Sequence, residues 1–436
     1  MPIQLAGTGG QFRSRFDVED VAVACVGVAL LAAAALQSGR GGECHRVSLD
    51  RPHVAAAMRS ERYFRRADAS PEPGFGPLSR FWPAADGWVR THGNFAWHRA
   101  ALTRALGTTD DVAVVAAALA SLPAADIEAR VFAAGGVAAA VRSADQWSAH
   151  PQGRALADEP LVSHERTGPA SPRVRPPGLL PAAGVRVLDL TRVIAGPICT
   201  RFLGALGADV LRLDPPHLPD LAVGAAADTL LGKRSARLDF RSAAGLSILH
   251  LLLAGSDVVV CGYRPGALDR FDLGPEALAL HHPGLVVVYL NAWGHRGPWS
   301  ARRGFDSVVQ APTGIAEGES ASGQPGALPC QLLDHGTGYL AAAAALDGLA
   351  RQIAEGGTHV RRLSLARTAM WLTSSGGAKA APQRATADPD QSPWLAELES
   401  VDGPVAAVAP PGALDGLPLR WPFPLTGYGL DRPIWP

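Results

Sequence analysis

Between residues 185 and 294, short apolar runs alternate with amphipathic helical stretches, and this alternation is the strongest constraint on the fold. The runs 185–190, 209–214, 257–263 and 285–294 are rich in Val and Leu, as strands buried on both faces are. Strands that alternate with helices pair in parallel through right-handed crossovers. The sequence therefore predicts an α/β fold with a doubly wound, Rossmann-like parallel sheet, accompanied by a smaller α+β domain.

Charge and cysteine content narrow the function classes. Lys and Arg number 40, as do Asp and Glu, so no excess charge favours nucleic acid or an anionic membrane as a partner. The 5 cysteines are scattered and lack CxxC spacing, which excludes a disulfide framework and a zinc motif. The 13 histidines show no metal-ligand spacing either. We expect a cytoplasmic protein without a bound metal.

The N-terminal 16 residues lack the basic and then apolar layout of a signal peptide. The first long apolar run, Val21 to Leu36, is rich in Ala and shorter than the roughly 20 residues that a bilayer span needs. We interpret it as a buried helix and expect no membrane partner.

Composition shifts predict the domain boundaries. Residues 164–183 are dense in Pro and Gly and lack apolar periodicity, as linkers do. The predicted segments are a flexible N-terminus (1–16), a first region (17–163), a linker (164–183), the Rossmann-like domain (184–375), a second linker (376–392) and a C-terminal tail (393–436).

Basic residues cluster in or near the predicted strand–helix loops, where ligands of doubly wound sheets bind. They are Lys233, Arg234, Arg264, Arg270, Arg302 and Arg303. A phosphate-bearing polyanion would explain them, although arginines also favour exposed loops in general. There is no GxGxxG after the first strand and no GxxxxGK[ST] motif, which disfavours NAD and ATP.

Two stretches of the chain resemble each other. Residues 20–58 and 334–372 both have an acidic start, an Ala-rich helix, a Gly-Gly turn, a strand and a further helix. A pair of repeats indicates duplication, since a solenoid needs three or more copies.

Five motifs occur in the order of a known family. They are residues 184–216, 232–245, 257–274, 282–316 and 332–346. Together they resemble the family III CoA-transferases (CaiB/BaiF), the group of formyl-CoA transferase, carnitine CoA-transferase and α-methylacyl-CoA racemase. Residues 81–107 and 133–153 resemble the family's small domain and the stretch that returns to its large domain. The family's halves thus stand in swapped or fused order.

The resemblance implies a chemistry. Asp334 matches the family's nucleophile, which attacks an acyl-CoA thioester and forms an aspartyl anhydride and then an aspartyl-CoA thioester. By position alone, Asp334 could instead be a helix N-cap. The family's CoA-binding positions carry over to Val193, Ala195, Lys233, Tyr263, Arg264, Arg270 and Arg303. Coenzyme A or acyl-CoA would be a substrate, with a carboxylic acid as acceptor and no permanently bound cofactor. The family also implies a homodimer.

Two alternatives to CoA transfer stay open. The first is racemisation of an α-substituted acyl-CoA, but Phe305 occupies the position where racemases carry a histidine and cannot move a proton. The second is a catalytically silent CoA-binding subunit, which the short stretch between Asp214 and Lys233 favours. The aromatic and histidine residues Trp88, His92, Trp97 and His98 are interpreted either as an acyl pocket or as ordinary core residues.

Overall fold

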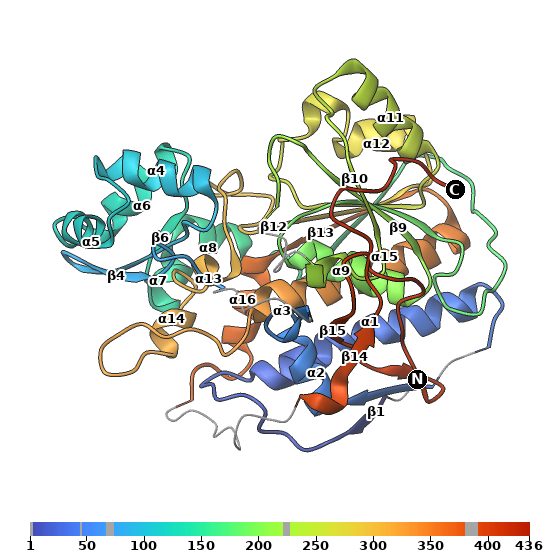
Figure 1. Ribbon diagram of the computed structural model, residues 1–436, viewed down its shortest axis with the longest axis horizontal. Helices are drawn as coiled ribbons and strands as arrows, with labels where there is room; N and C mark the ends of the chain where they lie inside the picture. The colour runs from blue at the N-terminus through green and yellow to red at the C-terminus, as the bar shows by residue number, and fades with distance from the viewer. Residues whose placement is uncertain (1–2, 44–45, 67–73, 221–226, 380–390) are drawn as a thin grey trace.

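The computed structural model describes residues 3–43, 46–66, 74–220, 227–379 and 391–436. These residues form a large α/β body around a seven-stranded sheet and a smaller body around a three-stranded sheet, as Figure 1 shows. The predicted fold class is confirmed.

The seven-stranded sheet carries the predicted Rossmann-like topology. Its strands in spatial order are β10 (Arg234–Arg237), β9 (Asp209–Asp214), β8 (Arg186–Leu190), β11 (Val258–Cys261), β12 (Val286–Asn291), β13 (Thr358–Ser364) and β7 (Ser163–Thr167). All neighbours pair in parallel except β7, which is antiparallel to β13. The six parallel strands therefore end at one common edge.

The sheet is buried on both faces, which explains the continuous apolar runs in its strands. On β11, Val258 and Val260 face one hydrophobic cluster, whereas Val259 and Cys261 face another. Helices α11 (Ala243–Ala254) and α12 (Pro275–His281) cover one face, and α9 (Ala195–Ala205) and α15 (Leu332–Glu355) cover the other (Figure 1).

The apolar run near the N-terminus forms α1 (Val18–Gly39), whose most extensive contact is with α15. α1 is long and apolar enough to cross a membrane by those two criteria, yet 61% of its most apolar window is buried in the fold. The sequence repeat appears as two matching units. They are α1, β2 (Val47–Asp50) and α2 (Arg51–Ala57) in one, and α15, β13 and α16 (Leu365–Ser374) in the other.

The prediction of a flexible N-terminus over residues 1–16 is wrong for the residues described. β1 (Ile3–Ala6) pairs in parallel with β2, and Phe12 and Phe16 are each only 3% exposed. The order comes from strand pairing with a partner more than 40 residues away, which composition does not reveal.

The N-terminal segment and the C-terminal tail build two small sheets together. One has the order β1, β2, β16 (Ala413–Leu414) and β17 (Leu417–Pro418). The other has the order β14 (Leu395–Leu398), β15 (Val405–Val408) and β3 (Arg65–Arg66). The start of the predicted region 17–163 thus packs with the large body. Most of the predicted linker 376–392 lies outside the described residues.

The small body contains the antiparallel strands β4 (Phe81–Ala84), β5 (Gly87–Thr91) and β6 (Ala138–Ala140). Helices α4 (Ala96–Leu106), α5 (Val112–Ala120) and α6 (Ala124–Ala133) pack on them around a core of their own. Helices α7 (Ala144–Ala149) and α8 (Pro151–Leu156) then lead back to the large sheet.

The linker predicted for 164–183 begins inside a strand. Residues 164–167 belong to β7, whose only neighbour in the described sheet is β13. An edge strand whose side chains face solvent needs no apolar periodicity, so the sequence pattern did not reveal it.

Gly338 allows α15 to lie directly against α9. A Cβ at this position would lie 2.5 Å from the carbonyl oxygen of Ala195 and 2.8 Å from the Cβ of Ile198. Gly338→Ala should therefore push the two helices apart and destabilise the protein by about 1–3 kcal/mol in urea unfolding. Gly39→Ala is the matched control, because a Cβ there would meet no atom within 4 Å and alanine is the better helix former. Equal stability of the two variants would contradict this packing argument.

Candidate active site

Asp334 lies in the first turn of α15, at the edge where the parallel strands end. α15 runs into the N-terminus of β13, so its own N-terminus is at the carboxyl edge of the sheet. The helix begins at Leu332 with Gln331 as its N-cap, so the N-cap interpretation of Asp334 is wrong. The Asp334 residue is 7% exposed, and its backbone N–H donates to Oδ2 of Asp306 at 3.0 Å.

Three carboxyl groups meet at this helix start. Asp306 begins the short helix α13 (Asp306–Val309), and Glu61 lies on α3 (Ser60–Tyr63). Burial, followed by the negative charges of Asp306 and Glu61, raises the pKa of Asp334 well above its usual value. Burial also raises the pKa of Asp306 to about 6, although the Asp334 N–H and the Gln310 amide donate to it. Ionising all three groups together is therefore unfavourable.

His335 directly follows Asp334 on α15, and adjacent helix residues do not face each other. It is fully buried, and its Nε2 lies 3.0 Å from Oε2 of Glu61. Burial opposes ionisation of Glu61, but the hydrogen bond and the charge interaction with His335 bring its pKa below the usual value. His335 thus fixes α3 beside the nucleophile candidate.

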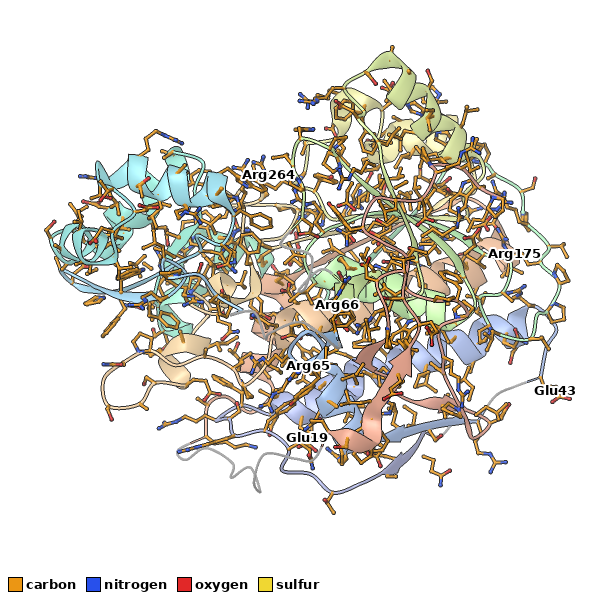
Figure 2. The ribbon with its side chains drawn as sticks, viewed as in Figure 1. Glu19, Glu43, Arg65, Arg66, Arg175 and Arg264 are labelled. Carbon is orange, nitrogen blue, oxygen red and sulfur yellow. The ribbon has the colours of Figure 1, made fainter. Side chains whose placement is uncertain are left out.

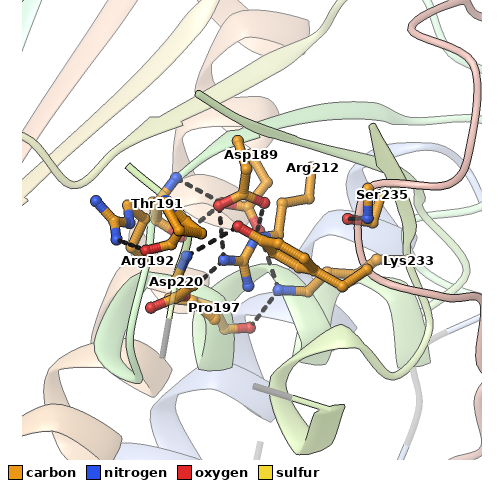
Figure 3. A network of polar contacts seen from close by, with 12 residues as sticks. Asp189, Thr191, Arg192, Pro197, Arg212, Asp220, Lys233 and Ser235 are labelled. Atoms are coloured by element: carbon orange, nitrogen blue, oxygen red, sulfur yellow. Dashed lines mark hydrogen bonds and ion pairs between the residues drawn. The ribbon is translucent and has the colours of Figure 1, made fainter. Parts of the chain in front are cut away.

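The loop after β8 holds two of the predicted CoA-binding positions. Val193 has a φ of 69°, a left-handed conformation that is rare for a β-branched residue. Its N–H donates to Oδ2 of Asp220 at 3.1 Å, and Asp220 in turn pairs with Arg212 at 2.6 Å (Figure 3). Ala195 begins α9 directly after this loop. A strained backbone held by a buried ion pair is typical of ligand-binding turns.

Lys233 does not present a free charge, contrary to the prediction that it pairs with phosphate. Its side chain is fully buried, and Nζ contacts Oδ2 of Asp189 at 2.9 Å and the carbonyl oxygen of Pro197 at 2.8 Å (Figure 3). Burial lowers the pKa of Lys233 to about 8, against the opposing charge of Asp189. The ion pair joins Asp189 on β8 to Lys233, which directly precedes β10. Lys233 therefore stabilises the packing beneath the loop that follows β8.

The basic residues that were predicted to lie together at one edge of the sheet do not all lie there. Arg234 starts β10 and pairs with Asp209 at the start of β9, which is the opposite edge. Arg302 contacts Glu128 of the small body at 3.4 Å.

Arg264 lies at the carboxyl edge of the sheet, and Figure 2 shows it between the two bodies. Burial and the positive charge of Arg303 both lower the pKa of Arg264. The exposed Arg270 covers the ring of Phe271 at 4.6 Å.

A pocket of about 210 Å³ opens where β11 and β12 end. Tyr263 and Arg264, both predicted CoA positions, line it together with Tyr289, His295 and Arg362. Burial raises the pKa of Tyr263 to about 12, so its hydroxyl stays a hydrogen-bond donor. A flat ring beside two guanidinium groups suits a nucleotide-like anion.

Aromatic rings and histidines fill the contact between the two bodies. Phe305 stacks on His92 with ring centroids 3.8 Å apart, and His98 lies 5.6 Å from Phe305. Burial lowers the pKa of His92 to about 3 and of His98 to about 4. Trp97 stacks on Phe95 at 4.7 Å, whereas Trp88 lies on β5 opposite Pro83. His92, Trp97 and His98 therefore belong to a packed interface.

Comparison with known proteins identifies the family of this chain. Residues 182–399, half of the chain, match the family described as CoA-transferase family III. The chain belongs to CoA-transferase family III.

The acetyl-coenzyme A transferase nodX of Hypoxylon pulicicidum is 34% identical over 204 residues, covering 45% of this chain and 34% of the relative. The probable fatty acyl-CoA transferase Rv3272 of Mycobacterium tuberculosis is 31% identical over 209 residues, covering 45% of this chain and 53% of the relative. The crystal structure of Rv3272 aligns with a TM-score of 0.43 at 31% identity, covering 45% of this chain and 56% of that chain. The chain thus spans about half or less of the length of these relatives.

Several residues of this family III site escaped the sequence analysis. Asp306 lies in the quoted 282–316 motif, and its place next to Phe305 could have drawn attention to it. Arg192 lies two residues after the end of β8, and its guanidinium lies over the ring of Phe95 at 5.4 Å. Glu61 and Arg90 come from the N-terminal region, and nothing local in the sequence connects them with Asp334.

The raised pKa of Asp334 predicts a stability effect with a defined sign. The folded state binds the Asp334 proton more tightly than the unfolded state does. The contribution of this proton to the free energy of unfolding is therefore fully present below about pH 4 and is lost as the pH rises through the pKa of the folded state. Asp334→Asn should therefore stabilise the protein at pH 8 by about 1 kcal/mol or more and make little difference near pH 4. Urea unfolding across this range measures it. The exposed Asp145→Asn is the control, and a destabilised Asp334→Asn at pH 8 would contradict the prediction.

Proposed function

We propose that this chain transfers CoA from an acyl-CoA to a carboxylic acid, with Asp334 as the covalent nucleophile. The observation that carries the proposal is the position of the Asp334 carboxyl group. It is buried among two further carboxyl groups at the sheet edge that also bears the Val193 turn and the Tyr263–Arg264 pocket. Family III membership and the names of the relatives support CoA transfer in general. A homodimer and a cytoplasmic location are part of the same proposal.

The reaction would proceed through two covalent intermediates. An Asp334 oxygen attacks the thioester carbonyl, the C–S bond breaks, and CoA leaves as a thiolate from a mixed anhydride. The thiolate then attacks the Asp334 carbonyl, which releases the first acid and leaves an aspartyl-CoA thioester. The acceptor carboxylate attacks this thioester and expels CoA thiolate again. The thiolate finally attacks the acyl carbonyl of the second anhydride, which yields the new acyl-CoA and free Asp334.

The electrostatic setting suits a carboxylate nucleophile. Burial and the charges of Asp306 and Glu61 make ionised Asp334 more basic than a solvated aspartate, and a more basic carboxylate is the stronger nucleophile. The same setting limits the ionised fraction at low pH. Backbone N–H groups at the start of α15 and α9 would favour negative charge at both covalent steps.

Trapping of the acyl-enzyme tests the nucleophile. The chain is incubated with a panel of acyl-CoAs and hydroxylamine, and intact-protein and peptide mass spectrometry locate the product. We expect a hydroxamate at Asp334 and loss of at least about 1,000-fold activity in Asp334→Ala, because the covalent route is then closed. The exposed Asp145→Ala serves as control. CoA binding without any adduct would favour the silent subunit, and deuterium exchange at the α-carbon without transfer would favour the racemase.

The pH profile tests the role of the carboxylate cluster. Asp334 must be ionised to attack, so kcat/KM should rise with pH through its raised pKa. Asp306→Asn removes the neighbouring negative charge and leaves an amide oxygen for the Asp334 N–H, so the rising limb should move to lower pH by about one unit. A limb that stays in place or moves to higher pH would contradict this account of the cluster.

A further inference from the structure

A second pocket, of about 310 Å³, lies beside the first turn of α15. Gln331, the N-cap of α15, and Ser307, the neighbour of Asp306, line it. The remaining polar lining includes Arg62, Arg90 and Gln310, and the apolar lining includes Phe75 and Phe81. No acidic side chain is among its described lining residues. The pocket therefore presents positively charged hydrogen-bond donors close to the proposed nucleophile.

Arg90 is the most unusual residue of this pocket. It lies on β5, is 7% exposed, and has its guanidinium 5.0 Å from the ring of Phe75 and 5.1 Å from that of Phe81. Among the described residues no carboxylate lies within ion-pair distance of its guanidinium, and its Nε is buried without a hydrogen-bond partner. Burial lowers the pKa of Arg90 to about 10, and the charge of Asp306 opposes this shift only in part. A buried arginine left without a carboxylate is costly.

Two further donors face the same space. Ser307 is 8% exposed, and its hydroxyl has no partner among the described residues. Arg62 is half-exposed at the pocket, with its Nε 3.6 Å from Oε1 of Glu61. Among the described residues, the Arg90 guanidinium has no carboxylate partner and the Ser307 hydroxyl has no hydrogen-bond partner, and aromatic rings flank the guanidinium. This set matches a small organic acid, because a planar carboxylate accepts two parallel N–H bonds.

We propose that this pocket binds the distal carboxylate of a short dicarboxylic acid, so that its other carboxylate faces Asp334. The inference rests on the proposed function, whose substrate class it names. A carboxylate bound by Arg90 has its lone pairs engaged and is a poor nucleophile, so the reacting carboxylate is the other one. The volume is at the lower end of small-molecule sites, about 300–1,000 Å³, which suits a short acid and excludes a long acyl chain.

Direct binding tests this pocket without any chemistry at Asp334. Titration calorimetry on the full chain, without CoA, compares succinate with butyrate, which has the same number of carbons but one carboxylate. We expect succinate to bind, and Arg90→Met to weaken it at least about tenfold, since a charge-assisted bidentate contact is lost. Ser307→Ala should weaken it less. Arg80→Met is the matched control, because Arg80 is exposed and lies over Trp82 at 5.1 Å on the same hairpin.

Melting temperature separates binding from a structural role. Arg90→Met removes a buried charge that no described carboxylate pairs with, and this variant should melt at the same temperature as the unmodified chain or higher. Succinate should raise the melting temperature of the unmodified chain and of Arg80→Met, but not of Arg90→Met. A large drop in melting temperature in Arg90→Met, with succinate still bound by Ser307→Ala at full affinity, would overturn the inference.

The remaining outcomes distinguish this inference from the proposed function. An Asp334 hydroxamate combined with no succinate binding, or with equal succinate and butyrate affinity, overturns the dicarboxylate pocket and leaves CoA transfer intact. Arg90-dependent succinate binding without any hydroxamate supports the pocket and removes the transferase. Faster CoA transfer to succinate than to butyrate, with the preference lost in Arg90→Met, supports both.

Discussion

The packing of α15 between the large sheet and α1 is the constraint on which the rest of the structure depends. Every residue of α15 from Leu332 to Leu346 is buried, including five consecutive alanines. A helix that is apolar on all sides must be covered on all sides. The sheet and α9 cover part of it, and α1 covers the remainder. The N-terminal segment therefore belongs to the body that holds Asp334.

This burial has an electrostatic consequence at the start of the helix. Asp334 is brought out of water together with Asp306 and Glu61, and no described lysine or arginine pairs with Asp334 or Asp306. The high pKa of Asp334 follows from lost hydration, with like charges adding to it. By contrast, the loop network around Lys233 and Arg212 balances its buried charges internally (Figure 3). Arg90 is a buried positive charge near the buried carboxyl groups of Asp334 and Asp306, and it lines the adjoining pocket.

The fold of the large body could be predicted because the sequence patterns that specify it are local. Strands buried on both faces read as Val- and Leu-rich runs, and the turn carrying Val193 lies within one motif. The same reasoning failed for β1 and β7, whose order depends on pairing with distant strands. It also misjudged Lys233, because a basic residue in a loop motif gives no sign of the buried Asp189 that neutralises it.

The sequence by itself determined the parallel sheet and the family, and it pointed to Asp334 as the candidate nucleophile, since periodicity and motif order are properties of contiguous residues. Only the tertiary structure decided what surrounds that carboxyl group. Glu61 and Arg90 lie more than 200 residues away from Asp334 along the chain, and Phe305 meets His92 across the contact between the two bodies. Charge and burial act through space, so the raised pKa of Asp334 and the burial of the Arg90 guanidinium arise only once folding has brought these segments together.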